Sequence, residues 1–180
     1  GQVQIKMKEK GILCGKPWVE ECFRQIDKDI RIKWLVEDGE NIKKNQLICV
    51  VEGLIASILM GERVALNFLQ LLSGTATSTA HFRNLVKSTS AKIFDTRKTI
   101  PGLRVAQKYA VLIGGGSNQR IGLFDHILLK ENHKNTFDSF KNMLQNIEHL
   151  ERVQIEVEDI KELKEALSFG VKNILLDNFS

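Results

Sequence analysis

Beyond residue 90, short apolar segments alternate with longer amphipathic ones, and this alternation limits the possible folds more than any other feature. The apolar segments predict strands at residues 92–94, 126–129, 153–157 and 173–176. The intervening segments have helical spacing, at residues 103–113, 137–150 and 160–169. Strands joined through helices form parallel sheets with right-handed crossovers. The sequence therefore predicts an α/β fold, either an α/β barrel or a doubly wound sheet.

Charged side chains lie at or just beyond the carboxyl ends of these strands. They are Asp95, Lys130, Glu156, Glu158 and Asp177. One such residue is often only a turn or cap residue, but here consecutive strands all deliver charge to the same edge. In an α/β barrel that edge carries the catalytic groups. The pattern therefore favours a barrel with a polar site at its rim.

The first sixty residues have a different, β-rich pattern. Strands are predicted at residues 30–36 and 47–51, with a turn at 37–41 in which Gly39 can adopt a positive φ. A short helix is predicted at 18–25, with Pro17 in its first turn. From residue 56 the apolar spacing becomes helical, and Gly61 and Gly74 mark either helix breaks or close packing. We predict one domain over residues 1–60 and a second over 61–180.

Composition excludes several classes of protein. The net charge is +4 with acids and bases nearly balanced, which does not indicate a nucleic-acid partner. The three cysteines form no CxxC pair and fit reduced thiols in the cytoplasm. No uninterrupted apolar run predicts a membrane span, and no signal peptide is expected. Because the chain begins at Gly1 and stops at Ser180 after a strand-like segment, we expect it to be a fragment.

Two loops carry cations in patterns suited to binding anions. In the first, Arg97 and Lys98 follow a predicted strand; Arg offers a planar fork for carboxylates or phosphates, and Lys a compact charge. The second is the glycine run 114–116, which precedes Arg120; it is not a GxGxxG motif and lacks the Gly-Lys-Ser/Thr ending of a P-loop. Its backbone could approach an anion or another chain segment closely. The alternative for each loop alone is an ordinary solvated loop.

The acidic residues suit a metal ion. Glu156 and Glu158 are two apart on one predicted strand, and Asp177 follows the next. Such oxygen ligands suit Mg²⁺ held jointly with substrate phosphates. The alternative for Glu156 is a simple pair with a nearby Lys. With no paired nucleophile and no zinc-type spacing, the residues favour group transfer driven by positioning and electrostatics.

Several strings in register resemble one enzyme family, the nicotinate-nucleotide pyrophosphorylases (carboxylating), also called quinolinate phosphoribosyltransferases. The strings are GERVALNF at 61–68, LSGTAT at 72–77, residues 95–102, KYA at 108–110, residues 114–120 and LDNF at 176–179. The resemblance covers essentially the whole chain. It implies a type II phosphoribosyltransferase fold, with an N-terminal α/β sandwich domain and an α/β barrel that is incomplete in this chain.

The resemblance also implies an activity. Members transfer phosphoribosyl from phosphoribosyl pyrophosphate to quinolinate with Mg²⁺, giving nicotinate mononucleotide, pyrophosphate and CO₂ in NAD biosynthesis. It implies a homodimer in which one subunit caps the barrel of the other. Neither a nucleic acid nor a membrane is an expected partner, and the expected location is the cytoplasm.

Residue roles follow from the resemblance position by position. Arg63 resembles the arginine that reaches into the partner's site, Arg97 and Arg120 resemble the carboxylate-binding arginines, and Lys130 completes the dicarboxylate pocket. The residues on the phosphoribosyl pyrophosphate and Mg²⁺ side are Lys98, Glu156 and Asp177, with both acids as metal ligands. Gln119 stands where the family usually has His, so no proton or charge is carried there. The family's 5′-phosphate loops lie beyond the matched strings.

Three alternatives remain open. The first is a paralogue of the same family associated with molybdenum transport, with a different acceptor. The second is a lipoyl- or biotinyl-type carrier, because residues 36–47 resemble the hairpin of such domains, although no Met-Lys or Asp-Lys tip follows. The third is a barrel fragment with no activity of its own.

Overall fold

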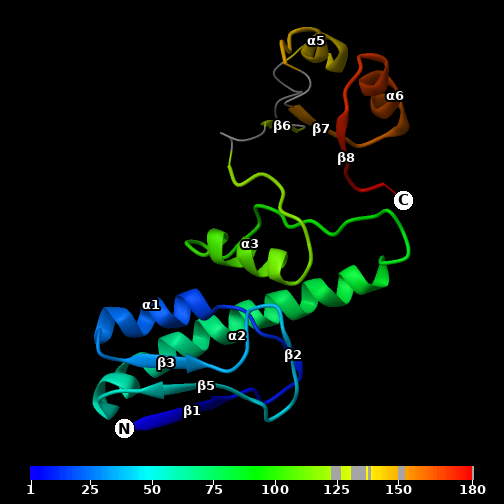
Figure 1. Cartoon of the computed structure of the whole chain (residues 1–180). Coiled ribbons are helices and arrows are strands. Elements are labelled where there is room, and N and C mark those ends of the chain that lie inside the picture. Colours follow the sequence, from blue (N-terminus) through cyan, green and yellow to red (C-terminus); the bar gives the residue numbers. More distant parts are fainter. Residues whose placement is uncertain (123–126, 131–136, 138, 150–152, 180) are drawn as a thin grey trace. The chain divides into compact units, whose positions relative to one another are not determined.

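A computed structural model describes residues 1–122, 127–130, 137, 139–149 and 153–179. The chain forms two compact units, Gly1–Gln119 and Arg120–Ser180 (Figure 1). The boundary predicted between residues 60 and 61 falls inside a long helix, and as a domain boundary it stays a prediction.

The first unit contains a three-stranded antiparallel sheet in the order β1 (Gln2–Lys6), β5 (Leu47–Glu52), β3 (Arg31–Trp34). Figure 1 shows α1 (Lys16–Ile26) and α2 (Ile55–Leu85) along this sheet. Side chains of β5, α1 and α2 form one apolar core, which includes Phe23, Ile48 and Ile58. The predicted strands at 30–36 and 47–51 and the helix at 18–25 are confirmed.

Two further features of this unit refine the sequence prediction. Gly39 adopts a φ of 95°, as the predicted turn requires. The two-residue strands β2 (Gly11–Ile12) and β4 (Asn41–Ile42) pair with each other and were not predicted. Strands this short leave no periodic signal in a sequence.

Helix α2 runs without a break through both Gly61 and Gly74, so the predicted breaks are wrong. At Gly61 the close-packing alternative is confirmed, because a Cβ there would lie 2.9 Å from the Phe23 ring of α1. At Gly74 a Cβ would meet nothing within 4 Å. By length and mean hydropathy (1.4 over its most apolar stretch) α2 could cross a membrane, a test that core helices also pass. Its buried residues, among them Ile58 and Leu72, contribute to two core clusters of the first unit.

The segment predicted as a strand at residues 92–94 forms only one bridge, between Phe94 and Ser117, so that prediction is wrong. It leads instead into a loop and then into α3 (Arg104–Ile113), whose predicted position is confirmed. A strand needs a neighbour along several residues, whereas here the backbone of Ile93 and Asp95 bonds to Ser117 alone among the described residues.

The glycine run after α3 ends a helix and does not present free amides. The N–H groups of Gly114, Gly115 and Gly116 all donate to carbonyls of α3, so the predicted anion cradle is wrong. The alternative of close approach is confirmed. A Cβ on Gly114 would lie 2.4 Å from the Ala76 carbonyl oxygen of α2, which only glycine avoids.

The second unit contains a three-stranded parallel sheet. Its order is β6 (Ile127–Leu129), β7 (Val153–Val157), β8 (Asn173–Leu176). Helices α5 (Phe140–Gln145) and α6 (Ile160–Ser168) follow the first two strands, so the predicted strand–helix alternation is confirmed. The helix predicted at 137–150 is shorter, and residues 126, 138 and 150 lie outside the described residues. This mixed α/β architecture matches the predicted sandwich and incomplete barrel.

Candidate functional site

The first candidate loop, residues 95–100, is fastened at its base by a buried ion pair. Lys108 Nζ of α3 lies 2.6 Å from Asp95 Oδ1, and both side chains are less than a tenth exposed. Lys108 also donates to the Gln119 carbonyl at 2.8 Å, and the Gln119 N–H donates to Asp95 Oδ1 at 2.8 Å. One carboxylate and one ammonium therefore join the base of this loop to the end of the first unit.

Arg97 and Lys98 stand on this fastened loop. The Lys98 N–H donates to Thr96 Oγ1 at 3.1 Å, and the Ile100 N–H donates to Gln107 Oε1 of α3 at 2.8 Å. The Nε of Arg97 is buried, and no described residue accepts a hydrogen bond from it. A buried donor without a partner is uncommon in a protein and is explained when a ligand supplies the acceptor. The loop thus offers a fixed backbone and an Arg97 Nε–H with no acceptor among the described residues.

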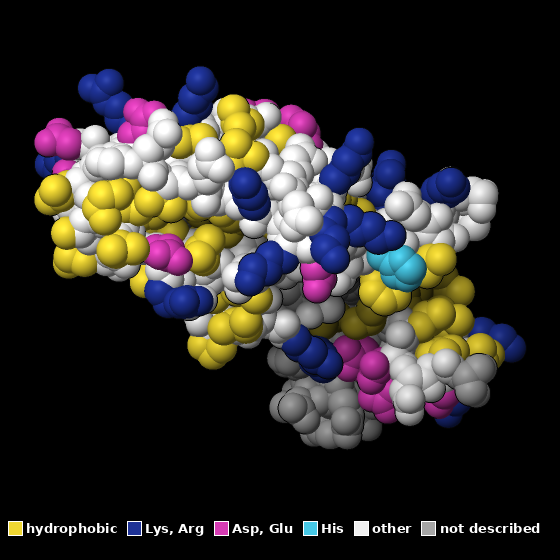
Figure 2. All heavy atoms as spheres, turned by 90° about the horizontal axis from the view of Figure 1, so that it is seen from below, with side chains coloured by type: hydrophobic (Ala, Val, Ile, Leu, Met, Phe, Trp, Pro, Cys, Tyr) yellow, Lys and Arg dark blue, Asp and Glu magenta, His cyan; other side chains and the backbone are white. Residues whose placement is uncertain are grey.

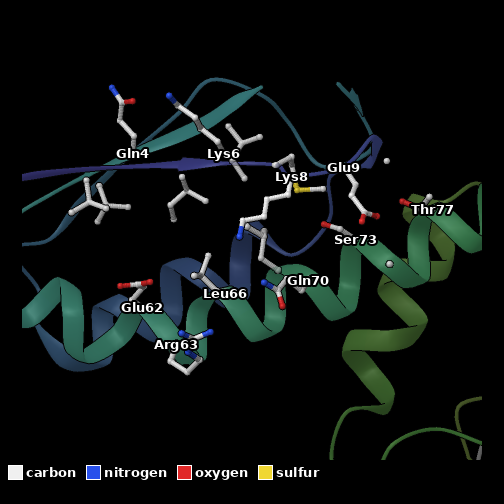
Figure 3. A pocket seen from close by; sticks show the side chains of 18 of the residues that line it. Gln4, Lys6, Lys8, Glu9, Glu62, Arg63, Leu66, Gln70, Ser73 and Thr77 are labelled. Carbon is white, nitrogen blue, oxygen red and sulfur yellow. The ribbon is translucent and has the colours of Figure 1, made fainter. Parts of the chain in front are cut away.

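Arg63 lies on α2, where it helps to line a groove of about 840 Å³ between α2 and the segment Val3–Gly11. Figure 3 shows Lys6, Lys8 and Glu9 on the side of the strand segment, and Glu62, Leu66, Gln70 and Ser73 on the side of the helix. Arg63 itself is exposed. Its position gives a solvent-facing cation on the long helix of the first unit.

In the second unit the predicted edge of charged residues is present. Lys130 directly follows β6, Glu156 lies near the end of β7, and Asp177 directly follows β8. The strands are parallel and in register, with Glu156 opposite Leu175 and Val157 opposite Leu176. Lys130 Nζ lies 3.0 Å from Glu156 Oε2. The alternative considered for Glu156, a pair with a nearby Lys, is therefore part of the same arrangement.

Glu156 and Glu158 lie in different surroundings at the end of β7. Val153, Ile155 and Val157 face the helices and form the apolar core of this unit. Because side chains alternate along a strand, Glu156 faces the other way, and its side chain is 9% exposed. Glu158 lies beyond the end of β7 and is exposed, and its N–H donates to Glu162 at 3.0 Å. Glu158 is therefore not on the same strand as Glu156, and a joint role for the two carboxylates stays a prediction.

The structure brings the predicted site residues together in two groups and leaves others apart. Asp95, Arg97, Lys98 and Gln119 share the loop region of the first unit, whereas Lys130, Glu156 and Asp177 share the sheet edge of the second. Arg120 begins the second unit. Among the described residues, no three His, Cys, Asp or Glu side chains gather as a metal site. Two carboxylates near one strand edge still fit Mg²⁺ that shares oxygen ligands with a substrate.

Sequence reasoning missed Lys108 and Asp38. Lys108 lies between the buried Ala106 and Ala110 on α3, so a cation within the buried stretch of a helix was the available signal. Asp38 accepts hydrogen bonds from the Gly15 and Lys16 N–H groups and from the Tyr109 hydroxyl at 2.9 Å, which joins α1 to α3. Burial, and then the hydrogen bond to Asp38, raises the pKa of Tyr109 well above its usual value.

Comparisons with known proteins match both parts of the chain. Residues 1–73 match the description "Quinolinate phosphoribosyl transferase, N-terminal domain", and residues 75–180 match the corresponding C-terminal domain. The chain is 37% identical to the probable nicotinate-nucleotide pyrophosphorylase (carboxylating) of Bacillus subtilis, over 98% of this chain and 63% of that protein. It is 37% identical to the mitochondrial quinolinate phosphoribosyltransferase 2b of Nicotiana tabacum, over 95% of this chain and 52% of that one.

A solved structure gives the same result. The nicotinate-nucleotide pyrophosphorylase from Francisella tularensis superposes with a TM-score of 0.93 at 42% identity, over 99% of this chain and 65% of the other. The chain thus spans between half and two thirds of the length of these relatives. Residues 36–47 lie inside the matched N-terminal domain, which favours this family over a lipoyl-type carrier. With both domain descriptions matched in order along the sequence, the chain belongs to the quinolinate phosphoribosyl transferase family.

Proposed function

We propose that this protein takes part in the transfer of phosphoribosyl from phosphoribosyl pyrophosphate to quinolinate, with loss of CO₂ and pyrophosphate, in NAD biosynthesis. The observation that carries the proposal is the match of both domains of one enzyme family. The 95–104 and 114–120 segments of this chain also carry cations. The names of the Bacillus subtilis and Nicotiana tabacum relatives state this chemistry for those proteins.

The physical chemistry of the substrates supports this assignment. Quinolinate carries two carboxylates and phosphoribosyl pyrophosphate carries several phosphate charges, so a site for both needs several cations. In this proposal Arg97, Arg120 and Lys130 bind the two carboxylates, and the unsatisfied Arg97 Nε is one donor for them. Gln119 contributes a neutral hydrogen bond in place of a charged one.

The opposite charge is needed where the ribose becomes electron-poor. As the bond to pyrophosphate weakens, positive charge develops on the ribose, and Glu156 or Asp177 stabilises it. The pyridine nitrogen then attacks the anomeric carbon. The ring, now cationic, accepts the electron pair that CO₂ leaves behind, and a proton from solvent then takes the place of CO₂ on that ring carbon. Lys98 binds phosphate oxygens. Glu156 and Asp177 would hold Mg²⁺, and the ion would supply positive charge to offset that of pyrophosphate.

We further propose that the active form is a homodimer in which Arg63 reaches the site of the partner subunit. Two observations support this. Arg63 is exposed on α2, and apolar side chains near it on the same helix are also exposed, with Leu59 59%, Met60 72% and Val64 50% accessible. Figure 2 shows hydrophobic side chains over a broad part of one face, with Lys and Arg among them. Exposed apolar surface of this kind is typical of a protein interface.

The proposed location is the cytoplasm. It is supported by the three cysteines, which are all free thiols in this fold. Fractionation of cells that express the protein tests this: recovery of the chain in a membrane or secreted fraction would contradict it.

Substitution of Arg97 tests the function. In the longest form of the chain that its gene encodes, we expect Arg97→Ala to lower quinolinate-dependent CO₂ release by at least about 100-fold with little change in stability. Exposed Lys87→Ala is the matched control and should keep parental turnover. Near-parental turnover of Arg97→Ala would refute the assigned role. CO₂ release by neither parent nor control, with phosphoribosyl transfer to another acceptor, would favour the molybdenum-associated paralogue.

A further inference from the structure

We propose that Lys108 is a positioning residue for the candidate site: its buried ammonium sets the backbone from which Arg97, Lys98 and Gln119 extend. This inference rests on the proposed function for its substrate readout, but its geometry lies wholly within the first unit. Lys108 belongs to none of the substrate-binding residues named above.

The first support is the direction of the three contacts. Lys108 Nζ donates to Asp95 Oδ1 at 2.6 Å and to the Gln119 carbonyl at 2.8 Å. Asp95 Oδ1 in turn accepts from the Gln119 N–H at 2.8 Å. Gln119 is therefore held at both its N–H and its C=O, by one side chain from the loop base and one from α3. The residue held in this way, Gln119, is a predicted substrate contact.

The second support is Asn118, which completes the cluster. In the amide orientation that satisfies both groups, its side-chain nitrogen donates to Asp95 Oδ2 at 2.7 Å and to the Lys108 carbonyl at 3.0 Å. Both oxygens of Asp95 are then bonded. Backbone bonds from Asp95 N–H to the Ser117 carbonyl and from Ser117 N–H to the Ile93 carbonyl join the same two segments. Two loops that are 24 residues apart in sequence, at Asp95 and Gln119, thus form one fixed unit.

The third support is the face that α3 turns toward the 95–100 loop. Arg104, Gln107 and Lys108 are spaced i, i+3 and i+4, so they lie on one side of the helix. Gln107 accepts from the Ile100 N–H at 2.8 Å, and Arg104 makes longer contacts with the Arg97 carbonyl and Thr99. The helix therefore holds the loop on both sides of Arg97 and Lys98.

Stability alone does not account for this ion pair. Lys108 is 3% exposed, and removing an ammonium and a carboxylate from water costs about as much as their attraction returns. Replacing a buried ion pair with apolar residues of similar size avoids this desolvation cost and is often neutral or stabilising. What an apolar pair cannot do is bond the N–H and C=O of Gln119. The charged pair is therefore explained by the geometry that it imposes on the loops.

An experiment can separate the stability of the fold from the positioning of Gln119. The double variant Asp95→Leu/Lys108→Met replaces the pair with apolar side chains of similar size, and Lys108→Met alone removes only the cation. Each is made in the longest form of the chain that the gene encodes, with exposed Lys87→Met as the matched control. The measurements are urea stability, amide hydrogen exchange without substrate, and KM and kcat with quinolinate.

We expect the double variant to regain most of the stability that Lys108→Met loses, but not the substrate affinity. Its KM for quinolinate should rise by about 10- to 100-fold, because a displaced loop weakens the contacts of its side chains with the substrate. A structural defect alone would reduce the folded fraction and so lower kcat at unchanged KM. The backbone amides at positions 95 and 119 should exchange at least about tenfold faster than in the parent, while the Phe23 amide in α1 should not change.

Three results would overturn the proposal. One is parental KM together with parental amide exchange in the double variant. Another is recovery of KM in step with stability, and the last is failure of both variants to fold, which would assign the pair to stability. If the parent itself does not use quinolinate, the proposed function fails separately, and amide exchange alone then decides the role of Lys108.

Discussion

Replacing Gly114 with alanine tests whether the glycine run is there to let α3 and α2 approach each other. A Cβ at Gly114 would lie 2.4 Å from the Ala76 carbonyl oxygen and 2.7 Å from Thr79 Cβ, both on α2. Ordinary contacts between such atoms are about 3.5 Å, so one helix must retreat by about 1 Å. The φ of Gly114 is −72°, which alanine adopts without strain. The effect of the substitution is therefore steric.

The expected magnitude follows from that contact. Overpacking costs about 1–3 kcal/mol, and we expect the upper end, because the obstructing atoms belong to helix backbone and Cβ, which cannot rotate away. Loss of glycine freedom in the unfolded chain returns about 0.4–1 kcal/mol. The free energy of unfolding should therefore fall by about 2 kcal/mol.

Gly74→Ala is the matched control. It lies within α2, where a Cβ would meet nothing within 4 Å, so it should raise the free energy of unfolding by about 0.5–1 kcal/mol. Both variants share the gain from the unfolded chain, and their difference isolates the steric cost. Urea unfolding followed by tryptophan fluorescence measures it, because both tryptophans, Trp18 and Trp34, lie in the first unit. Equal stability of the two variants would refute the close-approach explanation.

Two further predictions concern titration. Burial, reinforced at Cys14 by Asp38, raises the pKa of the Cys14 and Cys49 thiols to about 12. The stability that these neutral thiols give is fully present below the pKa of the unfolded thiol. It is lost as pH rises toward 12, by about 1.4 kcal/mol per pH unit for each thiol. Cys14→Ala should therefore make the free energy of unfolding in urea fall less steeply with pH, and an unchanged slope would contradict this. Gln119→His should make quinolinate affinity rise as pH falls through about 6.5, because His gains a charge there and Gln does not. The ratio of variant to parental Kd, measured from pH 5.5 to pH 8, tests this. A ratio that does not vary with pH would remove Gln119 from the binding site.

Much of the fold could be predicted from local pattern. The strands at 153–157 and 173–176 are predicted with their observed bounds, because 153–157 alternates apolar and polar residues and 174–176 is a short apolar run. Helices α3 and α6 were also recognised from their spacing. The segment at 92–94 has a similar apolar character but forms only one bridge. Whether an apolar segment becomes a strand depends on the neighbour it meets, which its own sequence does not specify.

The sequence by itself determined which residues carry charge and the order in which they follow strands and loops. Lys130, Glu156 and Asp177 could be placed at one edge of the sheet because parallel strands end on the same side. Tertiary structure alone decided what each charge does. Lys108 became a buried partner of Asp95, and the amides of the glycine run were used to end α3 instead of binding an anion. The physical reason is that the cost of burying a charge or an amide depends on partners brought near by folding, and these lie many residues away along the chain.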